Sequence, residues 1–214
     1  MNARHLLEGL MRQATTPSRS NGGSSGGLDP KSLMGGGALG LLVGSKRGRK
    51  LGGKALKYGA IAGVGALAWK AWQSRQGAST AAADELDRPL ERLAPQHQER
   101  RSLELLQAMI MAARADGHID GDERALIAER IDAIGADDDL HRWVETQLQA
   151  PLDAQALAAQ ADSPQAAREI YLVSLAIIDE QNPMERAWLD ELARALSLDA
   201  EMVQALEHQV AAAD

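Results

Sequence analysis

The amino-acid sequence predicts an all-α fold for the second half of the chain, and three observations support this prediction. Apolar residues recur at helical spacing from Glu99 onward. The first such face contains Leu103, Leu106, Ile110 and Ala113. No stretch of useful length alternates apolar and polar residues with the period of two that a half-buried strand requires. Aromatic residues make up 3% of the chain and Phe is absent, so the core must consist of Leu, Ile, Val, Met and Ala, which suits closely packed helices.

Cap residues mark the starts of further helices. Ser163-Pro164 places an N-cap before a Pro at the first helical position, Asn182-Pro183 repeats the arrangement, and Asp199 precedes the last helical pattern. The apolar residues that we place on inward helical faces after the first helix are Ile131, Ile134, Trp143, Val144, Leu148, Leu152, Leu157, Ile170, Val173, Ile177, Trp188, Leu189, Leu192, Leu196, Val203, Leu206 and Val210.

The net charge of −7 conceals a strong division of charge along the chain. Residues 1–80 contain 12 Lys and Arg and 2 acidic residues, whereas residues 81–214 contain 11 Lys and Arg and 28 acidic residues. A basic region of this kind usually faces an anionic surface, either membrane headgroups or nucleic acid. The absence of Cys excludes disulfides, thiolate metal sites and Cys nucleophiles.

We divide the chain into four segments by composition. Residues 1–32 form a short helix and a flexible Gly/Ser linker. Residues 33–72 form a basic, Gly-rich, apolar, membrane-associated segment with one or two short apolar helices. Residues 73–98 are a second linker with some helical potential. Residues 99–214 form the helical domain.

Two apolar runs in the second segment indicate contact with a membrane. LMGGGALGLLVG (33–44) and YGAIAGVGALAW (58–69) each contain about 12 residues, fewer than the ~20 that a spanning helix needs. Extending the second run to residues 55–72 gives 18 residues, provided that Lys57 and Lys70 reach toward the headgroups.

Five residues carry the membrane prediction in detail. Tyr58, Trp69 and Trp72 would lie near the two membrane interfaces, where amphipathic aromatic side chains are enriched. Gly59 and Gly63 are four residues apart, and small residues at that spacing let helices approach closely in lipid, which also permits a homo-oligomer. The alternatives are a Gly-rich tether or a pair of soluble helices packed on the domain.

The predicted location is the bacterial inner membrane, with membrane lipids as partners. The positive-inside rule places the basic stretch 46–57 on the cytoplasmic side. A single pass would put the acidic domain outside, whereas a re-entrant or surface-lying segment would leave it in the cytoplasm. We expect the cytoplasmic arrangement.

The stretch ADGHIDGDERALI (115–127) is the first of two acidic corners between predicted helices. It partly matches the opening of an EF-hand loop, but Ile127 stands where that loop needs a bidentate Glu, so an ordinary EF-hand is excluded. A different site for a hard cation such as calcium remains open, with Asp116, Asp120 and Glu123 as oxygen ligands. The alternative is that these residues are helix caps and a favourable acidic first turn.

The stretch IIDEQNPMERAWLDELA (177–193) is the second acidic corner, in which Asp179 and Glu185 lie on either side of a helix junction. If the two helical hairpins pack as pseudo-repeats, both corners lie close together. Four or more carboxylates would then converge, which is electrostatically unfavourable unless a cation or a proton relieves it.

The stretches MIMAARADGHIDGDERALI and AIIDEQNPMERAWLDELARALSL resemble the TerB-like tellurite-resistance domain. With its GGKALKYGAIAGVGALAWKAW segment, the whole chain is similar to the YebE-like inner-membrane proteins of bacteria. The resemblance covers the basic Gly-rich segment and nearly all of residues 99–212. It implies a bundle of about seven helices, an association with the bacterial envelope, no established enzymatic activity, and a cluster that binds divalent cations. The residues at the matching positions are Asp116, Asp120, Glu123, Asp179 and Glu185.

Other chemistry finds little support in the sequence. No nucleophile elbow, phosphate-binding loop or dinucleotide fingerprint is present, and the five His residues show no paired ligand spacing. The basic stretch lacks stacking aromatic residues, so we do not expect it to read nucleic acid.

The sequence therefore predicts a membrane-associated, non-enzymatic interaction or sensor module in envelope or metal stress. Cation binding at the acidic corners would stabilise one arrangement of its helical hairpins. The alternative is a soluble helical adaptor whose basic N-terminal arm binds a protein partner or nucleic acid. A third hypothesis is a hydrolase that uses paired carboxylates as acid and base.

Overall fold

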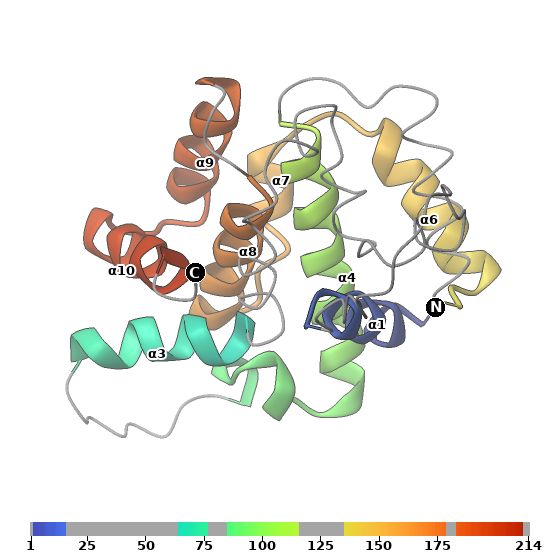
Figure 1. Cartoon of the computed structure of the whole chain (residues 1–214), viewed down its shortest axis with the longest axis horizontal. Helices are drawn as coiled ribbons and strands as arrows, with labels where there is room; N and C mark the ends of the chain where they lie inside the picture. Colours follow the sequence, from blue (N-terminus) through green and yellow to red (C-terminus); the bar gives the residue numbers. More distant parts are fainter. Residues whose placement is uncertain (1, 16–63, 77–84, 116–134, 179–182, 212–214) are drawn as a thin grey trace, which may run out of the picture.

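A computed structural model describes residues 2–15, 64–76, 85–115, 135–178 and 183–211 of the 214-residue chain. These ranges contain eight α-helices, two short 3-10 helices and no strand, so the all-α prediction is confirmed (Figure 1). The elements are α1 (Ala3–Thr15), α3 (Val64–Gln76), η5 (Glu85–Asp87), η6 (Leu90–Arg92), α4 (Pro95–Ala113), α6 (Asp138–Gln149), α7 (Ala154–Ala158), α8 (Pro164–Ile177), α9 (Pro183–Ala195) and α10 (Ala200–Ala211).

Helices α4 and α8 pack along each other and form the centre of the fold (Figure 1). Every residue of α8 from Gln165 to Ile177 is buried. The sequence explains this, because a helix that is apolar nearly all round is stable only when other elements cover all of its sides. Helices α1 and α6 pack against α4, while α3, α9 and α10 pack against α8.

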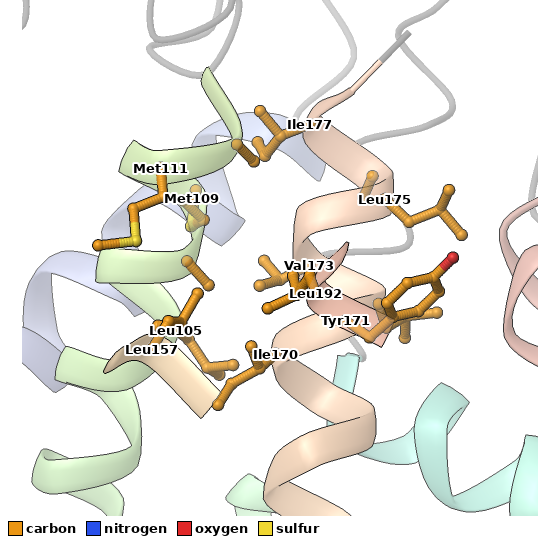
Figure 2. Close-up of a cluster of buried hydrophobic side chains, with 14 of the residues drawn as sticks. Leu105, Met109, Met111, Leu157, Ile170, Tyr171, Val173, Leu175, Ile177 and Leu192 are labelled. Carbon is orange, nitrogen blue, oxygen red and sulfur yellow. The ribbon is translucent and has the colours of Figure 1, made fainter. Parts of the chain in front are cut away.

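The core is mainly aliphatic, as the composition predicts, and also contains the buried aromatic residues Tyr171 and Trp188 (Figure 2). Leu105 and Met109 of α4, Ile170 and Val173 of α8, and Leu192 of α9 belong to one cluster and are each at most 1% exposed. Burying a side chain of this size contributes roughly 1.5–3 kcal/mol. The pairing of α4 with α8 is therefore stabilised mainly by the removal of apolar surface from water.

Two predicted helix starts are confirmed at atomic detail. Ser163 caps α8, because its side-chain oxygen accepts a hydrogen bond from Ala166 N at 3.1 Å, and Pro164 occupies the first helical position. Asp199 caps α10 by accepting from Met202 N at 2.7 Å. Helix α9 begins at Pro183, as predicted.

Helix α1 is held to α4 at its first turn. The Glu99 carboxylate accepts hydrogen bonds from Ala3 N at 2.7 Å and from Arg4 N at 3.1 Å. It thereby satisfies two of the free N–H groups at the helix start and places a negative charge at the positive end of the helix dipole. Leu6 and Leu7, at most 2% exposed, anchor the rest of the helix in the core.

Helix α3 joins the core through a face of small side chains. Val64, Ala68 and Ala71 are each at most 1% exposed and follow one another at helical spacing. This face packs against α8, α10 and η6. Gly65 lies close against η6 and α8, because a Cβ added there would be 2.9 Å from Leu90 N and 3.0 Å from Glu169 Oε1.

The prediction of an inner-membrane location is contradicted by these findings. Among the described residues, no helix is both long enough and apolar enough to cross a bilayer. Trp69 and Trp72 lie on the 13-residue α3 with their ring centroids 4.7 Å apart, and Trp72 packs against the protein core instead of a lipid interface. The apolar face of α3 is occupied by protein contacts. Tyr58, Gly59 and Gly63 fall outside the described residues.

We predict that Gly65→Ala destabilises the protein although Ala favours helices. The added methyl group overlaps the Glu91 carboxylate and crowds the Leu90 backbone, which cannot rotate away. Overpacking of this kind costs about 1–3 kcal/mol in the free energy of unfolding, measurable by urea titration. Ala66→Ser, at an exposed neighbouring position, is the control and should change stability by less than about 0.5 kcal/mol. An equal or more stable Gly65→Ala protein would show that α3 does not pack this closely.

Candidate functional site

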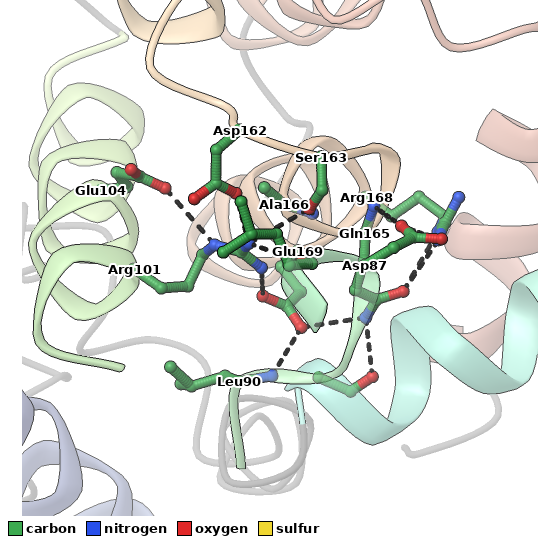
Figure 3. A network of polar contacts seen from close by, with 12 residues as sticks. Asp87, Leu90, Arg101, Glu104, Asp162, Ser163, Gln165, Ala166, Arg168 and Glu169 are labelled. Carbon is green, nitrogen blue, oxygen red and sulfur yellow. Dashed lines mark hydrogen bonds and ion pairs between the residues drawn. The ribbon is translucent and has the colours of Figure 1, made fainter. Parts of the chain in front are cut away.

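A network of buried charged side chains lies where α4, α8 and the two 3-10 helices meet (Figure 3). Its centre is Arg101 of α4, which is 1% exposed. The guanidinium donates to Glu169 Oε2 at 2.8 Å and to Asp162 Oδ1 at 2.6 Å. It also donates to Ser163 Oγ at 3.1 Å and to the Leu86 carbonyl at 3.2 Å. One side chain therefore connects α4 with η5, with the loop before α8 and with α8 itself.

Glu169 of α8 carries the network on to η6 and α3. It is fully buried, and its second carboxylate oxygen accepts from Leu90 N at 3.0 Å and from Gln165 Nε2 at 2.9 Å. The same Gln165 amide donates to the Gly65 carbonyl of α3 at 3.1 Å. Burial raises the pKa of Glu169, while Arg101 and these hydrogen bonds lower it. A buried charge is tolerated when it is paired and hydrogen-bonded in this way.

Glu104 is a third carboxylate beside the same arginine. Glu104 Oε2 lies 3.4 Å from Arg101 Nε, and neither atom makes a hydrogen bond, although Glu104 is only 4% exposed. Burial raises the pKa of Glu104 to about 7; Arg101 opposes the shift, and the charge of Asp162 adds to it. The Glu104 carboxyl group therefore loses its proton as the pH rises through neutrality.

Arg168 is the second buried cation, one turn along α8 from the cap. Its Nε and Nη2 atoms donate to Gln165 Oε1 at 3.2 and 3.0 Å. The carboxylate nearest to it in the network is that of Asp87, whose Oδ1 lies 3.5 Å from Nη2, farther than the carboxylates that Arg101 contacts. Its guanidinium carbon stands 5.5 Å from the centroid of the Trp72 ring, within the range of a cation–π interaction. Burial lowers the pKa of Arg168, while Asp87 and Glu169 oppose the shift.

A pocket of about 810 Å³ opens beside this network. Its walls come from Trp72 of α3, Asp87 of η5, the loop and first turns at the start of α8, and Met202 of α10. The turn between α9 and α10 (195–199) closes the remaining side, and Ser197 in that turn has a positive φ of 56°. The pocket is partly open to solvent, and its walls are part apolar and part polar. The network holds one side of the pocket, because Asp87, Asp162, Ser163 and Arg168 belong to both.

Comparisons with known proteins identify the family. The profile of DUF533, described as a protein of unknown function, matches residues 30–210, which is most of the chain. The chain belongs to the DUF533 family. This is a TerB-like family of bacterial proteins, so the predicted resemblance to the TerB-like domain is confirmed.

One curated relative illustrates the DUF533 similarity. An uncharacterized protein encoded in the ampR 5′ region of Yersinia enterocolitica is 32% identical over 112 residues, which cover 52% of this chain and 81% of that protein. No solved structure is significantly similar to the chain.

The predicted metal site of this DUF533 protein falls largely outside the described residues. Asp116, Asp120, Glu123 and Asp179 are not among them, and Glu185 lies in the first turn of α9, where it is half-buried and has interactions of its own. In the part of the chain that the structure does describe, no three acidic or His side chains gather as a metal site would require. The cation site at the acidic corners stays a prediction.

Sequence reasoning missed the buried network, although a signal for it was present. Arg168 and Glu169 stand side by side within the apolar run of α8, and Arg101 and Glu104 share one face of α4. Charged residues in a helix that is apolar all round must find partners, since unpaired charges are almost never buried. That argument could have predicted a pairing of the two helices, but not which arginine meets which carboxylate.

We predict that Arg101→Met lowers the free energy of unfolding by about 3–5 kcal/mol, because it leaves the Glu169 and Asp162 carboxylates without their cation. Arg100→Met is the matched control on the same helix. Its side chain is 58% exposed, so its loss should cost less than about 1 kcal/mol. Urea titrations of both variants measure the difference, and equal effects would contradict the central role of Arg101.

We predict that Glu104→Gln changes how stability depends on pH. The pKa of Glu104 is higher in the folded protein, about 7, than in the unfolded chain, about 4.5. The stability that comes from its protonated form is complete below pH 4.5 and is lost as the pH rises through 7. Between pH 5 and pH 8 the wild type should lose about 2 kcal/mol relative to Glu104→Gln, measured by urea titration at both pH values. A stability difference between the two proteins that is the same at both pH values would refute the shift.

Proposed function

We propose that this DUF533 protein is a non-enzymatic helical interaction module whose pocket between α3, α8 and α10 receives a segment of a partner protein. The observation that carries the proposal is the pocket itself, about 810 Å³ in volume, with one side held by a buried ionic network. That side is in place before a ligand arrives, so less ordering entropy is lost on binding.

The composition of the pocket supports a peptide as the ligand. Trp72, Leu196, Leu198 and Met202 offer apolar and aromatic surface, and Asp162 and other polar groups lie beside them. Aromatic and apolar anchors next to a few fixed polar groups are what peptide recognition uses. The position of Trp72 also gives α3 a role, since this helix supplies one wall of the pocket.

The similarity to YebE-like proteins suggests the cellular process in which the protein acts. The acidic and Gly-rich stretches that are similar to YebE-like proteins support a role in bacterial envelope or metal stress. A soluble adaptor with a basic arm is the alternative form of the same proposal, and both forms use the pocket.

Site-specific photo-crosslinking in cells tests the proposal. A photoreactive side chain at Ala161, in the wall of the pocket, should capture a partner reproducibly. Ala195→Phe fills the pocket and should reduce the yield about tenfold, equivalent to ~1.4 kcal/mol of binding free energy.

Ala156→Phe, on the exposed side of α7 and outside the pocket wall, is the matched control and should leave the yield unchanged. Crosslinks that persist in Ala195→Phe, or that never form, would reject the pocket as the docking site.

A further inference from the structure

The charges in the pocket wall are mostly negative. Three carboxylates, those of Asp87, Asp162 and Asp199, line the pocket together with a single cation, Arg168. Arg101 lies behind Asp162 and is shared with Glu169, so it does not neutralise the wall completely. The surroundings have the same sign, since residues 81–214 contain 28 acidic residues and 11 Lys and Arg. A pocket with this excess attracts cations.

Two of these carboxylates use only one oxygen each within the described structure. Asp87 Oδ1 accepts from Gln165 N at 2.8 Å and faces Arg168, and Asp162 Oδ1 accepts from Arg101 at 2.6 Å. Within the described part of the chain, no donor is hydrogen-bonded to Oδ2 of either residue. Neither Oδ2 atom is fully buried. The side chains are 21% and 12% exposed, so a ligand in the pocket can reach them.

The wall already holds one guanidinium of the chain itself. Arg168 rests on the Trp72 ring, at 5.5 Å, and is hydrogen-bonded to Gln165 beside Asp87. An aromatic face, an amide oxygen and a carboxylate are thus arranged to favour a planar cation. Figure 3 shows Asp162 apart from Asp87 and Arg168, at the start of α8. Because Asp87 is already paired with Arg168, Asp162 is the carboxylate in the pocket wall that a second cation would meet.

We propose that the pocket recognises a basic side chain, Arg or Lys, in the segment of the partner protein that it receives. This inference rests on the proposed function and names the chemistry of its ligand. The Oδ2 atom of Asp162 accepts a hydrogen bond from the cationic head, and the aliphatic stem lies on Leu196 and Met202. Charged donors on carboxylates make the stronger class of hydrogen bonds, and the stem of such a side chain covers apolar surface.

The test uses the full chain and two matched peptides. The probe is acetyl-Leu-Arg-Ala-Leu-amide, and its control carries citrulline in place of Arg, which keeps the shape of the side chain and removes its charge. Calorimetric titration at low salt should show that the Arg peptide binds at least about tenfold more tightly than the citrulline peptide. Raising the salt concentration should reduce this difference, because exposed charges are screened.

Variants of the protein separate charge from folding. Ala161→Lys adds a cation to the wall next to Asp162 while every residue of the ionic network is kept, and it should weaken the binding of the Arg peptide at least about tenfold. A third peptide with Glu in place of Arg should then bind Ala161→Lys better than the wild type. Ala159→Lys, exposed and outside the pocket wall, is the control and should leave binding unchanged. Thermal unfolding confirms that both variants fold.

Each outcome has one meaning. Equal binding of the Arg and citrulline peptides, both lost in Ala195→Phe, would overturn the cation preference while the pocket stays a docking site. No binding of the Arg peptide at about 1 mM would overturn the inference, and the crosslinking result would still decide the proposed function separately. Binding only after the six basic residues of 46–57 are changed to Gln would identify the chain's own basic stretch as the occupant and overturn the assignment to a partner. The residues changed are Lys46, Arg47, Arg49, Lys50, Lys54 and Lys57.

Discussion

The buried ion pairs of Arg101 are the interaction on which the arrangement of the helices depends. Apolar packing brings α4 and α8 together, but it allows helices to slide along each other, since many aliphatic contacts are similar in energy. A guanidinium that must meet Glu169 at 2.8 Å and Asp162 at 2.6 Å allows only one register. Breaking a buried pair of this kind costs about 3–5 kcal/mol, so a register that separates Arg101 from Glu169 and Asp162 is strongly disfavoured.

The same network turns a hydrophobic bundle into a pocket with fixed walls. Glu169 and Gln165 extend the ionic centre to η6 and to Gly65 of α3, so the helix that carries Trp72 is placed by hydrogen bonds as well as by apolar contact. Glu104 adds a proton that exchanges near neutral pH beside Arg101. Stability, pocket geometry and protonation therefore depend on one group of side chains.

The sequence predicted the parts of this protein that follow local rules. Helical spacing, the Ser163-Pro164 start and the Asp199 cap are local signals, and the structure confirms each of them. The location of the Trp72 side chain was not predictable in the same way. Aromatic residues beside an apolar run are compatible with a lipid interface and with a protein groove equally well. The contact of Trp72 with Arg168, 96 positions further along the chain, decides between the two, and no local pattern contains it. The pairing of Arg101 with Glu169 was missed for the same reason.

The separation of these contacts along the chain has a consequence for protein synthesis. The side-chain amide of Gln165 donates a hydrogen bond to the carbonyl of Gly65, which lies 100 residues earlier in the chain. The wall of the pocket likewise contains both Trp72 and Met202. The ribosome releases the N-terminal helices first, and domains fold as their residues emerge. Helix α3 therefore cannot bury its Val64, Ala68 and Ala71 face completely until α8 and α10 have been synthesised. The complete wall of the pocket, with Met202 in it, forms only after α10 has left the ribosome.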